Sequence, residues 1–295
     1  MKKTKPIKGV VTALVTPFAK QKVDFVSLKK LIRMQMDGGI QGLVVNGTTA
    51  ESPTLSAEEV EKIFKFVVKE TDKSIPILLG SGTNSTKTTI ERTKRAKTLG
   101  ADAALVVVPY YNKPPQRGIE QHYLQVAKLT KMPIIMYNVP GRTVVSMSNQ
   151  TIIAVARSEY ICGVKEASGE VSRVTELRKN TPKGFVLLSG DDATFVDFML
   201  AGGDGVISVI SNVLPRQAVE ISNQAVMLSS QAKTKYSKYS ELNRLLGVEA
   251  NPIPAKYILY KMGIIKSAEM RLPLVSMAKT YESTIDSELK KLGLI

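Results

Sequence analysis

The stretch Ile161-Cys162-Gly163-Val164-Lys165-Glu166-Ala167-Ser168-Gly169 is a short apolar run that ends on a single lysine and then becomes polar. Its apolar part alternates as a β-strand would, so Ile161, Gly163 and Lys165 share one face, and Gly163 leaves room beside the lysine. A lysine amine must be neutral to attack a carbonyl, and burial in apolar surroundings favours that neutral form. The stretch therefore predicts a strand that presents a nucleophilic amine, unless the lysine is only solvated or paired with Glu166.

Similar apolar runs occur on both sides of this stretch, and helical spacing follows most of them. Continuous apolar runs are typical of parallel strands that helices cover on the outside. We expect strands at Val10–Thr16, Leu43–Val45, Ile75–Leu79, Ala104–Val108, Ile134–Tyr137, Ile161–Lys165, Phe185–Ser189 and Val206–Val209. We expect helices after a Ser56–Glu59 capping box, after a cap at Asn84, and at Ile119–Leu129, Asn149–Ala156, Val171–Arg178 and Thr194–Leu200.

Eight such strand–helix units in roughly 210 residues have the size of a (β/α)8 barrel. The predicted fold is therefore α/β, a (β/α)8 TIM barrel over residues 1–212 that carries the active site, with a C-terminal helical extension over residues 213–295. An open, doubly wound sheet is the alternative, but such a sheet usually has a G-x-G-x-x-G turn after its first strand. Here Pro17-Phe18-Ala19 follows the first strand, which favours the barrel.

The composition excludes several kinds of protein. Cys162 is the only cysteine, so no intrachain disulfide is expected, which fits a cytoplasmic protein. His122 is the only histidine, so we expect no zinc site built on several histidines and no metal. The start Met1–Lys5 is interpreted as a basic tail before the first strand, and no apolar run is long enough for a transmembrane helix.

The net charge of +15 has two interpretations. A basic field attracts small carboxylate substrates, and it also suits nucleic acid. The lysines are scattered, however, and only Lys233, Lys235 and Lys238 form a modest cluster. We therefore expect neither nucleic acid nor a membrane as a partner.

Polar residues gather where the predicted strands end, which is where a (β/α)8 barrel performs its chemistry. They are Thr48 and Thr49 in Asn46–Ser52, then Tyr110 and Tyr111, Tyr137 and Arg142, Lys165, Ser189–Asp192 and Gly205–Ser208. Taken alone, each is equally a polar loop, a packed tyrosine or a solvated arginine. Together they suit Schiff-base chemistry on a keto acid, with an amine nucleophile, a hydroxyl proton relay and carboxylate anchors. Gly202, Gly203 and Gly205 precede a strand, so we expect a plain turn there and not a phosphate site.

At these residues the sequence closely resembles the dihydrodipicolinate synthase (4-hydroxy-tetrahydrodipicolinate synthase) family, which belongs to the N-acetylneuraminate lyase superfamily of pyruvate-dependent class I aldolases. The resemblance covers nearly the whole chain and rests on many ordered motifs. They are GTT-x-ES, PYYN, YNVP-x-R, G-x-KEA, SGDD, GVISV, NPIP and RLPLV. It implies a lyase that condenses pyruvate with L-aspartate 4-semialdehyde in lysine and diaminopimelate biosynthesis, with no cofactor other than the covalent Schiff base.

The resemblance also implies a role for each site residue. Lys165 would form the Schiff base, Tyr137 would donate and accept the proton, and Thr48 would link it to Tyr111. In this family that second tyrosine comes from a neighbouring subunit, so a homodimer or homotetramer is implied. The pyruvate site would include the carboxylate anchor Thr49 and the lining residues Gly190 and Ile207, and Arg142 would hold the carboxylate of the semialdehyde at the entrance.

The sequence departs from the family pattern in two places. Ala50 stands where the loop usually has glycine, and alanine resists the positive φ that glycine tolerates, so the loop shape is open to change. In lysine-inhibited members the inhibitor site near Ser52 and Asn84 uses further polar residues. The matching positions here are Ala57, Val60 and Thr88, so we expect weak or absent inhibition by lysine.

Three other functions remain as alternatives. Another pyruvate-dependent class I aldolase of the superfamily, an N-acetylneuraminate or keto-deoxy sugar acid lyase, would share Lys165 and Tyr137 but would have less need of Arg142. A nucleic-acid-binding protein would need its basic residues on one face. An inactive barrel used as a scaffold is disfavoured because every expected chemical group is present.

Overall fold

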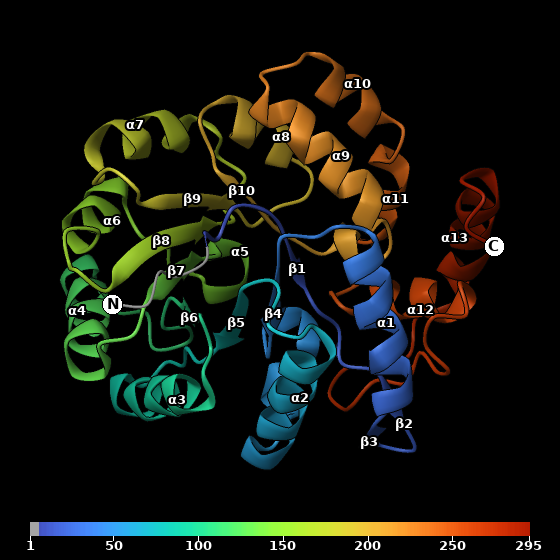
Figure 1. Ribbon diagram of the computed structural model, residues 1–295, viewed down its shortest axis with the longest axis horizontal. Coiled ribbons are helices and arrows are strands. Elements are labelled where there is room, and N and C mark those ends of the chain that lie inside the picture. The colour runs from blue at the N-terminus through green and yellow to red at the C-terminus, as the bar shows by residue number, and fades with distance from the viewer. Residues whose placement is uncertain (1–5) are drawn as a thin grey trace.

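A computed structural model describes residues 6–295 and contains a closed barrel of eight parallel strands (Figure 1). Around the barrel the strand order is β1-β10-β9-β8-β7-β6-β5-β4, and pairing of β1 with both β10 and β4 closes it. The strands are β1 (Gly9–Ala13), β4 (Gly42–Val45), β5 (Ile77–Gly80), β6 (Ala103–Val107), β7 (Ile134–Asn138), β8 (Ile161–Glu166), β9 (Val186–Ser189) and β10 (Gly205–Ser208). The predicted (β/α)8 barrel is confirmed.

Helices surround the barrel and form the C-terminal part of the chain (Figure 1). The α-helices up to residue 226 are α1 (Phe25–Asp37), α2 (Ala57–Glu70), α3 (Thr86–Leu99), α4 (Gln116–Thr130), α5 (Pro140–Thr143), α6 (Asn149–Val155), α7 (Ser172–Asn180), α8 (Phe195–Leu200) and α9 (Pro215–Val226). The later ones are α10 (Gln231–Ser237), α11 (Ser240–Leu245), α12 (Ile253–Lys261) and α13 (Lys279–Lys291). Three short 3-10 helices are η1 (Thr48–Ala50), η2 (Ser52–Thr54) and η3 (Ile210–Asn212).

The strands are apolar on both faces because both faces are buried. Inside the barrel, alternate residues such as Val11, Leu78 and Ile135 form one apolar cluster. Their neighbours, such as Val10 and Ile134, point outward and join a larger cluster under the helices. This double burial is the reason that the strands appear in the sequence as continuous apolar runs.

Local chemistry accounts for most of the differences from the predicted boundaries. Strand β5 starts at Ile77 and not at Ile75, since Pro76 has no N–H to donate to a ladder. The Ser56 capping box of α2 is confirmed, but the predicted cap at Asn84 is wrong. Helix α3 is capped by Ser85, whose hydroxyl accepts from the N–H of Thr88.

A short antiparallel pair, β2 (Phe18–Ala19) and β3 (Lys22–Val23), was not expected, because strands of two residues show no periodicity in a sequence. The predicted helical extension is present: α9 packs on β1, α1 and α8, and α11 and α12 pack on α13. The division at residue 212 remains a prediction. Within residues 6–295, no helix combines the length and the hydropathy needed to span a bilayer.

Candidate active site

Lys165 and Tyr137 lie side by side at the carboxyl ends of neighbouring strands. The register of β7 and β8 pairs Tyr137 with Lys165. Both residues are buried, and Lys165 Nζ lies 4.3 Å from the centroid of the Tyr137 ring. Among the described residues, Lys165 makes no ion pair with a carboxylate. The fold thus places a buried amine against a phenol without an acidic partner.

Glu166 does not pair with Lys165, although it is the next residue. Successive side chains of a strand point to opposite faces, so Glu166 leaves the barrel interior. Its oxygens accept from the Asn138 amide at 3.1 and 3.0 Å and from the N–H of Ser168 at 2.8 Å, and Arg173 Nη2 lies 3.4 Å away. The alternative in which Glu166 neutralises the lysine is therefore wrong.

Glycine provides the space for the lysine side chain, but at a different position from the one we expected. A Cβ at Gly190 would lie 2.7 Å from Lys165 Cε. A Cβ at Gly163 would instead lie 2.5 Å from the carbonyl oxygen of Val186 on the adjacent strand. Gly190 therefore makes room for the amine, whereas Gly163 allows two strands to approach each other.

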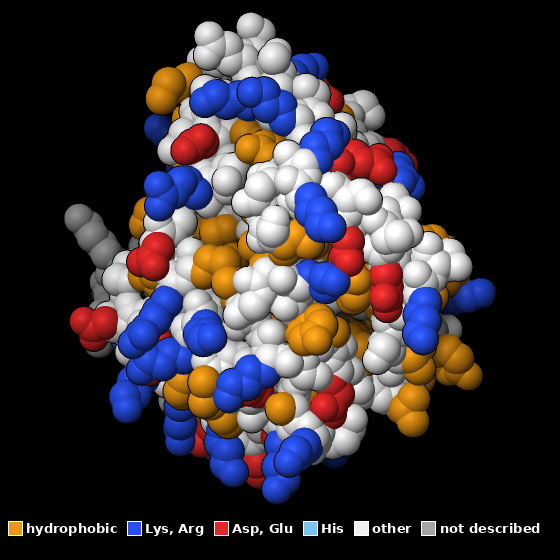
Figure 2. All heavy atoms as spheres, turned by 90° about the vertical axis from the view of Figure 1, so that its right-hand side faces the viewer, with side chains coloured by type: hydrophobic (Ala, Val, Ile, Leu, Met, Phe, Trp, Pro, Cys, Tyr) orange, Lys and Arg blue, Asp and Glu red, His pale blue; other side chains and the backbone are white. Residues whose placement is uncertain are grey.

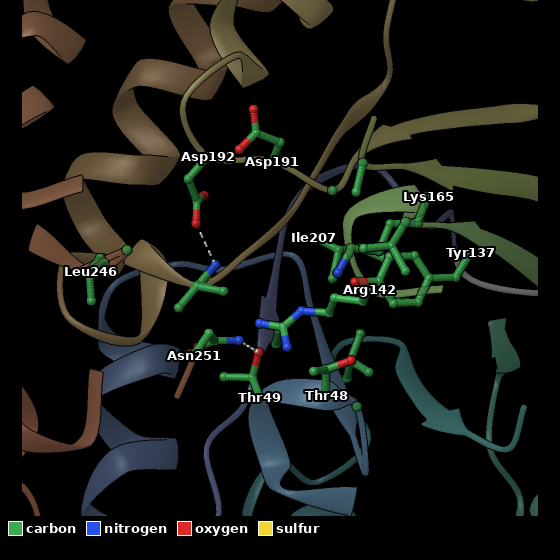
Figure 3. A pocket seen from close by; sticks show the side chains of 18 of the residues that line it. Thr48, Thr49, Tyr137, Arg142, Lys165, Asp191, Asp192, Ile207, Leu246 and Asn251 are labelled. Carbon is green, nitrogen blue, oxygen red and sulfur yellow. Dashed lines mark hydrogen bonds between the residues drawn. The ribbon is translucent and has the colours of Figure 1, made fainter. Parts of the chain in front are cut away.

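A cavity of about 430 Å³ opens over the lysine (Figure 3). It is lined by seven of the eight residues singled out in the sequence: Thr48, Thr49, Tyr137, Arg142, Lys165, Gly190 and Ile207. In the view of Figure 3, Arg142 extends over the cavity between the lysine and the two threonines. From these seven residues the barrel brings one amine, one phenol, two hydroxyls and one guanidinium to the same cavity.

Thr49 has a partner that the sequence did not reveal. Asn251, just before α12, donates from Nδ2 to Thr49 Oγ1 at 2.9 Å. A hydroxyl that accepts one hydrogen bond keeps its own proton to donate. Thr49 is therefore prepared to donate to a bound carboxylate, and the amide that orients it comes from the C-terminal part of the chain.

Four further lining residues were missed, whereas Asp192 belongs to the strand-end run Ser189–Asp192 named from the sequence. Asn243, Arg244, Leu246 and Gly247 reach the cavity from α11 and the turn after it, where no motif indicates a site. Asp192 accepts from the N–H groups of Val209 and Ile210 at 2.7 and 2.9 Å. Burial raises the pKa of its carboxyl, and these two hydrogen bonds oppose that effect. Asp192 thereby holds the turn after β10, which carries Ile207 into the cavity.

Tyr111 lies apart from the other predicted residues in the single chain. Its side chain is 87% exposed and its backbone has φ of +74°. It is absent from the cavity lining among residues 6–295. In the single chain the phenol of Tyr111 is therefore presented to solvent and not to the cavity.

The threonine loop tolerates Ala50 without strain. Ala50 lies in the 3-10 helix η1 and is buried, and its φ is not positive. The residue with positive φ is Glu51, at +57°. Alanine therefore fits this position without backbone strain, and both threonines of the loop line the cavity.

A second cavity, of about 510 Å³, adjoins the first and shares Thr48, Val139 and Arg142 with it. Its other lining residues include Ser52, Asn84, Ser85, Thr88, Arg92 and Tyr110. Two of the lining side chains are arginines, and none of those described is a carboxylate. The cavity is therefore suited to anions and not to ammonium groups.

Basic side chains and metal-ligating side chains are two further features that could mark a site. Figure 2 shows lysine and arginine side chains scattered over one face among acidic and uncharged ones. Within the described part of the chain, no three His, Cys, Asp or Glu side chains form a group able to hold a metal ion. Burial raises the pKa of the Cys162 thiol to about 12, which makes it a poor nucleophile.

Comparison with known proteins points to one family. Residues 6–292 match the dihydrodipicolinate synthetase family. The chain is 47% identical over 295 residues to a 4-hydroxy-tetrahydrodipicolinate synthase of Bdellovibrio bacteriovorus, an alignment that covers 99% of this chain and 100% of the relative. The chloride-inhibited dihydrodipicolinate synthase of Acinetobacter baumannii, solved with pyruvate, has a TM-score of 0.95 at 43% identity, covering 98% of this chain and 100% of that one. A monomeric dihydrodipicolinate synthase variant has a TM-score of 0.95 at 40% identity, covering 98% and 97%.

Proposed function

We infer the chemistry of this site from one premise: the chain belongs to the dihydrodipicolinate synthetase family. It is a lyase of the class I aldolase type, and it condenses pyruvate with L-aspartate 4-semialdehyde in lysine and diaminopimelate biosynthesis. The family needs no metal cofactor. What remains to be proposed is which residues perform each step.

We propose that Lys165 is the nucleophile. Its neutral amine adds to the keto carbon of pyruvate, and water leaves as the imine forms. Loss of a methyl proton then gives an enamine, whose carbon attacks the aldehyde of the second substrate. The observation that carries the assignment is a buried amine 4.3 Å from the Tyr137 ring and without an acidic partner.

Proton transfer is assigned to hydroxyl groups. Tyr137 is next to the amine and, with Thr48, lines the same cavity. The exposed Tyr111 of a second copy completes the relay in this proposal, which makes a homodimer the smallest active unit and a homotetramer a pair of such dimers. The oligomeric state of the purified protein at assay concentration tests this point, and a fully active monomer would contradict it.

Carboxylate recognition is assigned to two groups. Thr49 donates its free hydroxyl proton to pyruvate, since Asn251 occupies its acceptor side. Arg142 lies where the two cavities meet, and a guanidinium binds a carboxylate with two parallel hydrogen bonds. Arg142 also separates this function from that of a sugar acid lyase, because Arg142→Ala should impair use of the semialdehyde far more than that of pyruvate.

The decisive experiment is reduction with borohydride in the presence of pyruvate, followed by peptide mapping. The covalent Schiff base predicts a pyruvate-dependent mass gain on Lys165. Label on another lysine, or none, would contradict the assignment. We also place the enzyme in the cytoplasm, where its substrates occur as metabolites of amino-acid biosynthesis.

Feedback inhibition by lysine is proposed to be weak or absent. The second cavity presents Arg92 and Arg142, and a lysine ligand would bring its ammonium group to them without a carboxylate partner. Steady-state assays at increasing lysine test this proposal. Half-inhibition below about 1 mM, which corresponds to about −4.1 kcal/mol of binding, would contradict it.

A further inference from the structure

The loop that carries Thr48 and Thr49 is connected to a buried ion pair. Glu51 follows η1 and takes positive φ, which turns its side chain into the protein, where the side chain is fully buried. Its Oε1 accepts from Lys256 Nζ at 2.7 Å, and its Oε2 accepts from the backbone N–H of Arg271 at 3.0 Å. Both carboxylate oxygens therefore bind groups of the C-terminal part of the chain.

Lys256 is enclosed completely. It lies on α12 with no exposed surface, and its Nζ is 4.3 Å from the centroid of the Phe18 ring. Burial lowers the pKa of Lys256, and the charge of Glu51 opposes that effect. A buried ion pair seldom stabilises a fold more than apolar residues of equal size would, so stability alone does not explain this arrangement.

The same segment reaches the loop at a second point. Asn251 lies five positions before Lys256 and holds the Thr49 hydroxyl. Thr49 and Glu51 are two positions apart, so α12 and the turn before it hold both ends of a very short segment. A shift of α12 relative to the barrel would move the threonine hydroxyls in the cavity.

We propose that the buried Glu51–Lys256 pair sets the position of the Thr48–Thr49 loop, and that Lys256 is thereby a positioning residue for the reaction. The proposal rests on the roles given above to Thr48 and Thr49. Catalysis requires bound groups to be held within a fraction of an ångström, and a misplacement of about 1 Å can lower a rate about 100-fold.

The test uses a neutral replacement that leaves no buried charge unpaired. In the double variant Glu51→Gln with Lys256→Met, the glutamine still accepts from the N–H of Arg271. We expect a folded oligomer whose kcat/KM falls about 10- to 100-fold, with a raised KM for pyruvate. Lys261, on the same helix as Lys256, makes a partly exposed pair with Asp286 of α13. Lys261→Met breaks that pair, and as the matched control it should leave KM unchanged.

Glu51→Asp keeps both charges of the buried pair and shortens the carboxylate's reach by one methylene. It should raise KM for pyruvate in the same direction, so that a double variant that fails to fold does not end the test. A folded double variant, or a folded single one, with the KM and kcat of the wild type would overturn the proposal. Borohydride trapping on the wild type distinguishes a failure of the proposed function from a failure of the positioning role. A missing label on Lys165 refutes the proposed function, whereas a normal label together with unchanged variant kinetics refutes only the positioning role.

Discussion

Within residues 6–295 two lysines are buried, Lys165 and Lys256, and they differ in whether a carboxylate pairs with them. Lys165, at the mouth of the barrel, lies over Tyr137 at 4.3 Å, while Lys256, at the contact between barrel and extension, lies over Phe18 at the same distance. Lys256 has the carboxylate of Glu51 at 2.7 Å, and Lys165 makes no ion pair with any described residue.

This difference underlies the two roles that we propose. An opposite charge favours the ammonium form, so the carboxylate of Glu51 supports the charged form of Lys256 even though burial lowers the pKa of that amine. In our proposal the same side chain, with an aromatic ring at the same distance, serves as nucleophile in one region and as an anchor in the other. The predictions below test this comparison.

The largest effect is expected for Lys165→Ala. Removing the amine that we propose forms the covalent intermediate should lower kcat/KM by a factor on the order of 10⁶, the scale on which loss of a catalytic nucleophile acts. The unfolding free energy should stay the same or rise, because no ion pair is lost. Steady-state kinetics and urea unfolding measure both. If Lys165→Ala kept a kcat/KM comparable to that of the wild type, Lys165 would be the wrong lysine for the Schiff base.

Lys256→Met, unlike Lys165→Ala, should lower the free energy of unfolding. It leaves the Glu51 carboxylate buried without its cation, and breaking a buried pair in this way typically costs about 3–5 kcal/mol. Urea unfolding at pH 7 measures the loss, with Lys165→Met as the matched control in the other region. If both variants lost the same stability, the distinction between the two lysines would fail.

His122 is a third buried base and tests the rule behind the comparison. Its Nδ1 is 3.0 Å from the Thr86 hydroxyl, no carboxylate pairs with it among the described residues, and burial lowers its pKa to about 4. Its contribution to stability is therefore complete above the unfolded pKa of about 6.5 and is lost as the pH falls to about 4. The shift corresponds to roughly 3 kcal/mol.

Urea unfolding of the wild type and His122→Gln at pH 7 and pH 4 isolates this contribution, because carboxylates titrate equally in both proteins. The wild type should lose more stability than the variant between these values. An equal loss in the two proteins would show that burial without an acidic partner does not keep this base neutral.

The smallest effect is expected for Tyr137→Phe, which keeps the ring beside Lys165 and removes only the hydroxyl. General acid–base groups typically contribute about 10²-fold or more, so kcat should fall about 100-fold. Borohydride trapping should still label Lys165, since the amine and its aromatic neighbour remain. If this variant kept the wild-type kcat, the proton transfer would have to be assigned to a group other than the Tyr137 hydroxyl.

Much of the fold and most of the site could be predicted because the signals are local. Apolar runs, a capping box and polar residues at strand ends lie within a few positions of one another, and the barrel places the ends of its strands around one cavity. Seven of the eight proposed site residues therefore meet as expected. The eighth, Tyr111, lies outside the cavity of its own chain, and its proposed role needs a second copy of the chain.

The strands of the barrel, the amine, the phenol and the hydroxyls could thus be predicted from local sequence, because each depends on one strand and its end. The groups that hold them are visible only in the folded chain. Asn251 meets Thr49 across 202 positions and Lys256 meets Glu51 across 205, and Gly190, not Gly163, makes space for the lysine. Such contacts leave no periodicity in the sequence, because they arise only when α12 packs against the closed barrel.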